Sequence, residues 1–234
     1  MSASPAAAPR PVVVAIDGPA ASGKSSTARW VAERLGFRHV DSGALYRAVT
    51  LLAMREFGPA AGWAGDVLAR AADRITLVPV PAGFDPAIDG ASVAEAVRGT
   101  DVTRNVSAVA QMPAVRAWVN AQVRAAARSH AVVVDGRDIG TVVFPDADVK
   151  IFLVADAWER ARRRLLQEHG RAASDAEIAA EAARLAQRDA RDATQTVQAR
   201  DAILLDTTFL TQADQVDRIV SLVRALPTGQ QTRP

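Results

Sequence analysis

One segment near the N-terminus constrains the fold more than any other part of the chain. Residues 18–25, Gly-Pro-Ala-Ala-Ser-Gly-Lys-Ser, match the pattern G-x-x-x-x-G-K-[ST] between an apolar run at 12–17 and a helical stretch. A strand, a glycine-rich loop and a helix in this order bind phosphate, because backbone N–H groups and the helix N-terminus both point at the anion. Lys24 is predicted to reach the β- and γ-phosphates of a nucleotide, and the Ser25 hydroxyl to ligate Mg²⁺. The residues predicted to hold the nucleotide phosphates are Gly18, Pro19, Ala20, Ala21, Ser22, Gly23, Lys24, Ser25 and Ser26.

Apolar runs and helical stretches alternate along the rest of the chain. Five short apolar runs, which are continuous rather than alternating, are predicted to be buried parallel strands: 12–17, 37–41, 131–135, 149–154 and 202–206. Helices are expected between them at 23–35, 44–57, 113–129, 157–169, 175–191 and 213–226. This order predicts an α/β fold with a five-stranded parallel sheet flanked by helices.

Two intervals depart from this alternation. Residues 66–109 contain a short helix, a strand-like segment at 74–80 and a hairpin signal at Asp89-Gly90, so they are predicted to form a small inserted subdomain. Residues 162–200 are dense in arginine and are interpreted either as a solvated helical pair or as a lid over an anionic ligand. The domain is expected to span 12–226, with a core of 12–65 and 110–226 between disordered tails at 1–11 and 227–234.

Composition excludes several other kinds of site. The 234 residues include no cysteine, which excludes disulfides, cysteine-ligated metals and thiol catalysis, and the three histidines have no metal-ligand spacing. No apolar run approaches the roughly 20 residues that span a bilayer, so we expect a cytoplasmic protein without a membrane partner. The net charge is +2 although the pI is about 9.6, because Lys24 and Lys150 are the only lysines beside many arginines. The arginine excess is compatible with phosphate ligands, although a GC-rich coding sequence explains the overall count better.

The phosphate loop alone leaves several nucleotide-binding classes open. A guanine-binding Asn-Lys-x-Asp motif is absent, which disfavours a GTPase. The apolar run ending at Asp135 resembles the strand that carries a second metal-binding carboxylate, but Gly136-Arg137-Asp138 follows it instead of the acidic pair of a hydrolytic ATPase. An arginine at this point indicates a second anionic ligand.

Further cations follow the predicted strands. In a parallel sheet covered by helices, ligands gather at the carboxyl ends of the strands, and three such ends carry Lys24, Arg47 and Arg137. Two arginines facing a phosphate loop suit a phosphoryl acceptor that carries its own phosphate. The sequence therefore favours a small-molecule or nucleotide kinase.

Three segments together resemble the bacterial cytidylate kinases, which are P-loop nucleoside monophosphate kinases. They are 17–26 (DGPAASGKSS), 41–47 (DSGALYR) and 135–147 (DGRDIGTVVFPDA), and the third is distinctive of this family. Weaker agreement comes from 107–116, 160–164 and 188–192, and the resemblance covers residues 12 to about 206. It implies a P-loop kinase fold in which 66–109 is a CMP-binding insert and about 162–200 is an arginine-rich lid.

The resemblance also implies a role for individual residues. Lys24, Arg137 and Arg188 would be catalytic, ATP and Mg²⁺ would bind at the phosphate loop, and Asp138 would accept a hydrogen bond from the cytosine amine. The residues implied to bind the acceptor nucleotide are Ser42, Tyr46, Arg47, Ser107, Arg116, Arg137, Asp138 and Asp192. The implied reaction converts ATP and CMP or dCMP into ADP and CDP or dCDP by a monomeric enzyme. Tolerance for UMP and the range of phosphoryl donors stay open.

Two other functions compete with this interpretation. One is a different small-substrate P-loop kinase. The other is a nucleic-acid-binding P-loop NTPase, suggested by the high pI. Acidic residues interleave with the arginines, as in Arg188-Asp189, and aromatic residues make up only 5% of the chain, which disfavours nucleic acid as a partner.

The chain departs from the family at one position. Related sequences carry an arginine three residues after the segment 188–192, followed by Pro-Leu, whereas this chain has Gln195 there and lacks the Pro-Leu pair. Because that arginine is thought to bind the acceptor phosphate, one cationic contact is in question. We expect Arg200 to substitute for it, unless Arg191 does so or Arg47, Arg137 and Arg188 suffice.

Overall fold

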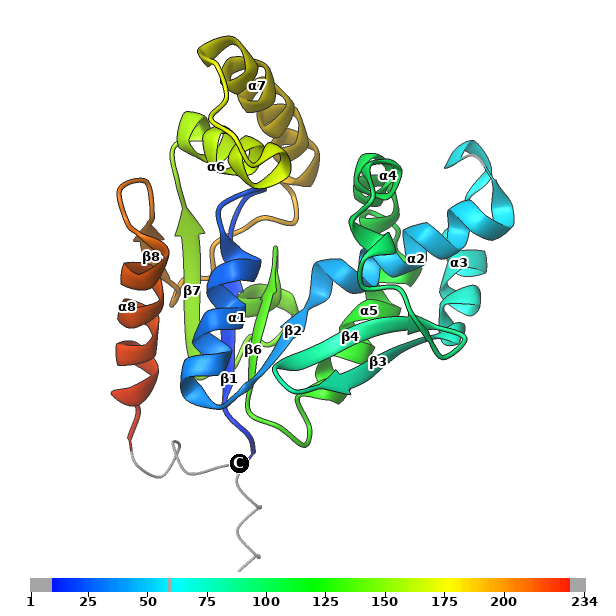
Figure 1. Cartoon of the computed structure of the whole chain (residues 1–234). Coiled ribbons are helices and arrows are strands. Elements are labelled where there is room, and N and C mark those ends of the chain that lie inside the picture. Colours follow the sequence, from blue (N-terminus) through cyan, green and yellow to red (C-terminus); the bar gives the residue numbers. More distant parts are fainter. Residues whose placement is uncertain (1–9, 59, 228–234) are drawn as a thin grey trace, which may run out of the picture.

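The computed structural model of the chain describes residues 10–58 and 60–227, and its centre is a parallel sheet (Figure 1). The sheet core has the strand order β2-β6-β1-β7-β8, and each neighbouring pair is parallel. The bounds are β1 Val13–Asp17, β2 Arg38–Asp41, β6 Val132–Gly136, β7 Val149–Val154 and β8 Ile203–Asp206. All five predicted strands are therefore confirmed to within a residue at either end.

The sheet is larger than the sequence predicts, because the strands of the insert join it. Among the described residues it has eight strands, because β4 (Gly83–Ile88) pairs in parallel with β2, and β3 (Ile75–Val80) and β5 (Ala91–Ser92) pair antiparallel with β4. β4 meets β2 at Gly83 and His39, where a Cβ on Gly83 would lie 2.4 Å from the His39 carbonyl oxygen. Only glycine allows this approach, so the five-stranded parallel sheet extends into a mixed one.

Eight α-helices surround the sheet in the described part of the chain. Six match the predicted ones: α1 (Lys24–Leu35), α2 (Ser42–Phe57), α5 (Pro113–Ala126), α6 (Ala157–His169), α7 (Asp175–Asp192) and α8 (Gln212–Arg224). The short helix expected in the insert is α3 (Gly65–Ala71). α4 (Thr100–Ala110) was not predicted, although it buries Val102, Val106 and Val109 at helical spacing.

Two buried clusters explain why the strands are apolar on both faces. Val13 and Ala15 of β1 pack into one cluster with α2 and α5, whereas Val14 and Ile16 pack into the other with α1 and α8. Both faces of the central strands are thus covered by helices, as the continuous apolar runs predict.

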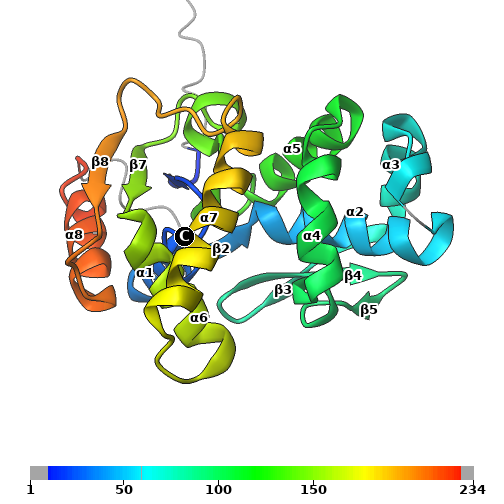
Figure 2. The same ribbon diagram turned by 90° about the horizontal axis from the view of Figure 1, so that it is seen from above.

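The α6–α7 pair lies above the carboxyl ends of the central strands, and α4 of the insert lies beside it (Figures 1 and 2). The Nε2 of Gln111, just after α4, donates to the carbonyl of Arg191 at 3.3 Å, so the two parts meet on one side.

The tails predicted at 1–11 and 227–234 lie outside the described residues except for three positions. Arg10, one of these, contacts the folded domain through Asp148 at 2.9 Å and the carbonyl of Asp146 at 2.7 Å. No described helix has the length and apolar character needed to cross a membrane.

Candidate active site

The phosphate loop joins β1 to α1 at the carboxyl edge of the sheet. Gly18 has φ +150° and a Cβ on it would lie 2.2 Å from the Leu153 carbonyl oxygen, so only glycine fits. The Nζ of Lys24 lies over the loop and donates to the Pro19 carbonyl at 2.6 Å. Burial lowers the pKa of Lys24 well below its ordinary value, and the charge of Arg137 lowers it further. The charges of Asp135 and Asp17 offset this shift only in part, so an incoming phosphate would add negative charge beside the buried ammonium group.

A carboxylate at the end of β6 lies between a serine and a histidine. Asp135 Oδ2 accepts a hydrogen bond from Ser25 Oγ at 2.5 Å, and its Oδ1 lies 2.7 Å from His39 Nε2. Burial alone would raise the pKa of Asp135, but His39, Ser25 and Lys24 outweigh it and hold the pKa below its ordinary value. An ionised carboxylate beside a hydroxyl is a set of hard oxygen ligands that fits Mg²⁺ together with nucleotide phosphates. His39 is a member of this site that the sequence does not predict.

Asp17 fixes the turn that follows β6. Its two carboxylate oxygens accept the N–H groups of Ile139 at 2.8 Å and Gly140 at 2.7 Å. Burial raises the pKa of Asp17 to about 6, although both N–H donors oppose the shift. The same turn carries Arg137, whose Nη1 donates to the Gly18 carbonyl at 3.1 Å, so the turn and the phosphate loop are tied together.

Three arginines from separate elements gather near Lys24. Arg137 lies within 3.4 Å of Asp192 Oδ2, whereas Arg188 reaches the same oxygen only at 3.8 Å. Arg47 of α2 donates to Thr103 Oγ1 at 2.7 Å. Burial, together with the charges of Arg137 and Arg47, lowers the pKa of Arg188 to about 10. This excess of cations over carboxylates favours an anionic ligand.

A fourth arginine belongs to the same group. Arg164 of α6 lowers the pKa of both Arg47 and Arg188 through its charge, although burial is the largest cause in each. It also lies 3.0 Å from Glu168 and 3.1 Å from Glu181, which offset its charge. The sequence predicts Arg164 only as one residue of an arginine-rich segment, because nothing in its local sequence distinguishes it from the neighbouring arginines.

The residues predicted to contact a pyrimidine base lie beside the cluster of arginines near Lys24, on the side that faces the insert. Arg116 of α5 forms an ion pair with Asp138, and it also donates to the Ala110 carbonyl at 3.1 Å. Burial raises the pKa of Asp138, although Arg116 opposes this. Tyr46 Oη, near this pair, is buried without a hydrogen-bond partner among the described residues.

Two predicted serines are buried on the same side. Ser42 Oγ donates to the Asp135 carbonyl at 2.7 Å, and Ser107 lies buried in α4. Ser42 thus contacts the end of β6, and Tyr46 lies near the Arg116–Asp138 pair, whereas the role of these residues in binding a base stays a prediction.

Arg160 and Asp189, which the sequence does not predict as site residues, connect α6 and α7 to the phosphate loop. Asp189 accepts the N–H of Ala20 at 2.9 Å, and Arg160 donates to the Ala20 carbonyl at 2.7 Å and to Asp189 at 2.6 Å. The arginine-rich segment therefore positions the loop as well as offering cations to a ligand. Only the three-dimensional contact distinguishes Arg160 from the other arginines of the run.

The structure does not support Arg200 as a substitute for the family arginine. Arg200 is exposed and precedes the amino end of β8, whereas the phosphate loop lies at the carboxyl ends of the strands. Its neighbour Asp201 pairs with Lys150 at 2.8 Å, which fixes this turn away from the cleft. Arg191 is also exposed and donates to the Gln187 carbonyl at 3.3 Å. The expectation for Arg200 is wrong because Arg200 lies at the amino end of β8, at the opposite edge of the sheet from the phosphate loop.

A cavity of about 1170 Å³ opens beside these groups. Its walls come from the phosphate loop, α2, β4, α6 and the loop after β8. Residues 21–26 and Arg47 line it, whereas the other residues predicted to bind the acceptor are not among its lining residues.

Comparison with known proteins decides the family. The family model described as "Cytidylate kinase" matches residues 14–225. The chain belongs to the cytidylate kinase family. A cytidylate kinase of Limosilactobacillus fermentum is 43% identical over 219 residues, which cover 91% of this chain and 95% of that protein. A cytidylate kinase of Chlorobaculum tepidum is 41% identical over 232 residues, covering 94% and 96%. The resemblance inferred from the three sequence segments is thereby confirmed, and the P-loop α/β fold agrees with it.

Proposed function

We propose that this chain transfers the γ-phosphoryl group of ATP to CMP or dCMP, giving ADP and CDP or dCDP. The observation that carries the proposal is the gathering of Arg47, Arg137 and Arg188 around the phosphate loop of Lys24, next to the Arg116–Asp138 pair. One phosphate site with a second cationic site beside it suits a donor triphosphate and an acceptor monophosphate. Membership of the cytidylate kinase family supports the identity of the acceptor.

The chemistry requires positioning and charge neutralisation rather than a strong base. An acceptor phosphate oxygen, already largely ionised at neutral pH, attacks the γ-phosphorus in line while the bond to the β-phosphate oxygen breaks. Lys24, Arg137 and Arg188 neutralise the charge on the transferred group, and the buried state of Lys24 strengthens its attraction for phosphate. Arg47 and Arg137 would hold the acceptor phosphate in place.

Mg²⁺ would be held by Ser25 and Asp135 with the ATP phosphates. When bound, it supplies positive charge to the β- and γ-phosphate oxygens. The hydrogen bond from Ser25 to Asp135 and the ionised state of Asp135 support this assignment.

The acceptor nucleoside would occupy the flank formed by α2, α4, α5 and the turn after β6. Asp138 would accept a hydrogen bond from the exocyclic amine of cytosine, and Arg116 and Ser107 would contact the ring edge. Tyr46 and Ser42 would border the nucleotide, and Asp192 would contact the sugar. The uncompensated hydroxyl of Tyr46 supports the presence of a ligand there.

We propose that the insert at 66–109 and the lid at about 162–200 close over the substrates. Closure would exclude water, which otherwise competes with CMP for the phosphoryl group. With CMP and a non-hydrolysable ATP analogue together, amide hydrogen exchange should slow in both segments and stay unchanged in α8. Equal exchange with and without ligands would refute closure.

The acceptor assignment is tested by incubating the protein with ATP, Mg²⁺ and a panel of acceptors. We expect CMP and dCMP to be phosphorylated at least tenfold more efficiently than other monophosphates and hydroxyl compounds. Transfer to a different acceptor alone would replace the proposal with another small-substrate kinase. ATP hydrolysis stimulated by nucleic acid would favour a nucleic-acid-binding P-loop NTPase. The structure disfavours that alternative, because Arg160 and Arg162 are paired with acidic side chains. The monomeric state and cytoplasmic location stay predictions.

A further inference from the structure

Three backbone N–H groups of the loop between β8 and α8, residues 207–211, are hydrogen-bonded. The N–H of Thr207 donates to the Val154 carbonyl at 2.8 Å, and that of Leu210 donates to the Thr207 carbonyl at 3.2 Å. The N–H of Thr208 donates to Asp206 at 2.9 Å. These hydrogen bonds join the loop to β7 and to Asp206, so the loop is a rigid support for the side chains that it carries.

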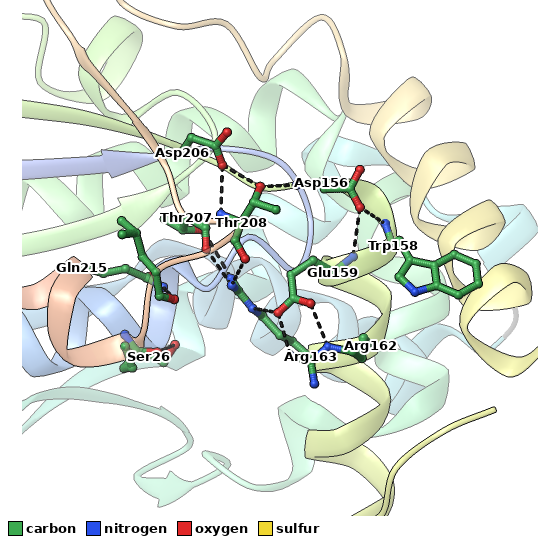
Figure 3. Close-up of polar contacts among 12 residues, drawn as sticks. Ser26, Asp156, Trp158, Glu159, Arg162, Arg163, Asp206, Thr207, Thr208 and Gln215 are labelled. Carbon is green, nitrogen blue, oxygen red and sulfur yellow. Dashed lines mark hydrogen bonds and ion pairs between the residues drawn. The ribbon is translucent and has the colours of Figure 1, made fainter. Parts of the chain in front are cut away.

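Contacts with α6 fix the same loop from the other side (Figure 3). Arg163 Nη2 donates to the carbonyls of Thr207 at 2.6 Å and Thr208 at 3.1 Å, while its Nε donates to Glu159 at 2.7 Å. The N–H of Asp156 donates to Thr208 Oγ1 at 3.0 Å, so the start of α6 is bonded to the loop as well. The position of the loop is therefore fixed relative to the start of α6, which leads into the lid.

The loop carries Phe209, whose ring lines the same cavity as the phosphate loop. Phe209 is 96% exposed, more than any other large apolar side chain of the described residues, and it lines the cavity with Ser26 and Gln212. Ser26 Oγ lies 3.1 Å from Gln212 Oε1, so the loop adjoins the helix that begins at Lys24. A fully exposed ring on a fixed support, next to a phosphate site, suits an aromatic ligand group.

Polar side chains at this end of the cavity are bonded to the protein instead of pointing into the cavity. Gln212 Nε2 donates to Thr27 at 2.8 Å, and Gln215 bonds to Thr27 at 2.9 Å and to the Leu210 carbonyl at 3.3 Å. Arg162 is held by both oxygens of Glu159, at 2.7 and 2.8 Å. A base at this position would meet a ring face and few free hydrogen-bonding groups.

We propose that Phe209 stacks on the base of the phosphoryl donor and that stacking, rather than hydrogen bonding to the base edge, sets the donor range. The inference rests on the proposed function in taking a nucleoside triphosphate as donor. Stacking strength grows with ring area and depends little on ring substituents, so purine donors are favoured over pyrimidine donors and ATP is only weakly favoured over GTP.

Calorimetric titration with ADP in the absence of any acceptor tests the contact. Phe209→Ala should weaken ADP binding about tenfold, while Phe209→Trp should keep or improve it. Leu204→Ala is the matched control, because Leu204 is also an exposed apolar side chain, 55% exposed, on the outer strand β8. Unchanged ADP affinity in Phe209→Ala would overturn the proposal.

A series of nucleoside triphosphates tests whether stacking sets the range of phosphoryl donors. In the wild-type protein the KM values for ATP and GTP should differ less than fivefold, with CTP at least tenfold higher, and Phe209→Ala should largely remove the purine preference. A strong preference for ATP over GTP would show that the base edge is recognised and would overturn the stacking rule. ADP binding needs no acceptor, so the two proposals can fail separately. If Phe209→Ala binds ADP more weakly but the wild-type protein does not phosphorylate CMP, the proposed acceptor is refuted and the role of Phe209 stands.

Discussion

Replacing Lys24 with alanine should lower kcat for phosphoryl transfer by about a thousandfold. The Nζ of Lys24 lies over the phosphate loop, and its charge offsets the charge that develops on the transferred group. The KM for ATP should change much less, because the backbone N–H groups of the loop and the N-terminus of α1 remain. Steady-state kinetics with CMP and ATP measure both constants.

Lys150→Ala is a matched control for this variant, since Lys150 is the other lysine of the chain and is also buried. It loses the pair with Asp201 at 2.8 Å, so Tm should fall while kcat stays near the wild-type value. Lys24→Ala should not lose stability through its charge: the folded state lowers the pKa of Lys24, so the protonated amine opposes folding at every pH below its unfolded pKa. Near-wild-type turnover of Lys24→Ala would contradict the assignment of the phosphate loop.

The elements that could be predicted from the sequence are those specified by local chemistry. The apolar runs of β1, β6 and β7 are continuous because both faces are covered, and the glycines and Lys24 of the phosphate loop occur at fixed spacing. Each of these signals is contained within a few consecutive residues.

The elements that could not be predicted depend on contacts between distant segments. Gly83 of the insert has no local sign that it approaches His39, and β4 contains Pro86, a residue type that is unusual inside a strand. In the site, Arg160 and Arg164 belong to the same arginine run, yet one holds the phosphate loop and the other joins the cationic group. Arg200 was misplaced for the same reason, because the direction of β8 separates it from the cleft.

Asp138→Ala should lower the ratio of kcat/KM for CMP to that for UMP by about two orders of magnitude. Cytosine presents an amine donor where uracil presents a carbonyl, so an ionised carboxylate accepts from CMP and repels UMP. Arg116 opposes the rise in pKa that burial causes at Asp138 and so favours its ionised form. Initial rates over a range of CMP and UMP concentrations, at saturating ATP, give the ratio.

Two further variants test whether the charge of Asp138 itself causes this result: Asp138→Asn removes the charge, and Asp101→Ala removes a different carboxylate. Asparagine keeps the shape of the side chain, but its amide can also donate to the uracil carbonyl, so the CMP/UMP ratio should fall at least as far as in the alanine variant. Asp101 is an exposed carboxylate in the first turn of α4, so Asp101→Ala should leave the ratio unchanged. In the wild-type protein the ratio should also fall as the pH is lowered through the raised pKa of Asp138, because the protonated carboxyl can donate to uracil. If the ratio is the same in Asp138→Asn as in the wild type, the charge of Asp138 does not distinguish the two bases, and Arg116 or Ser107 must do so.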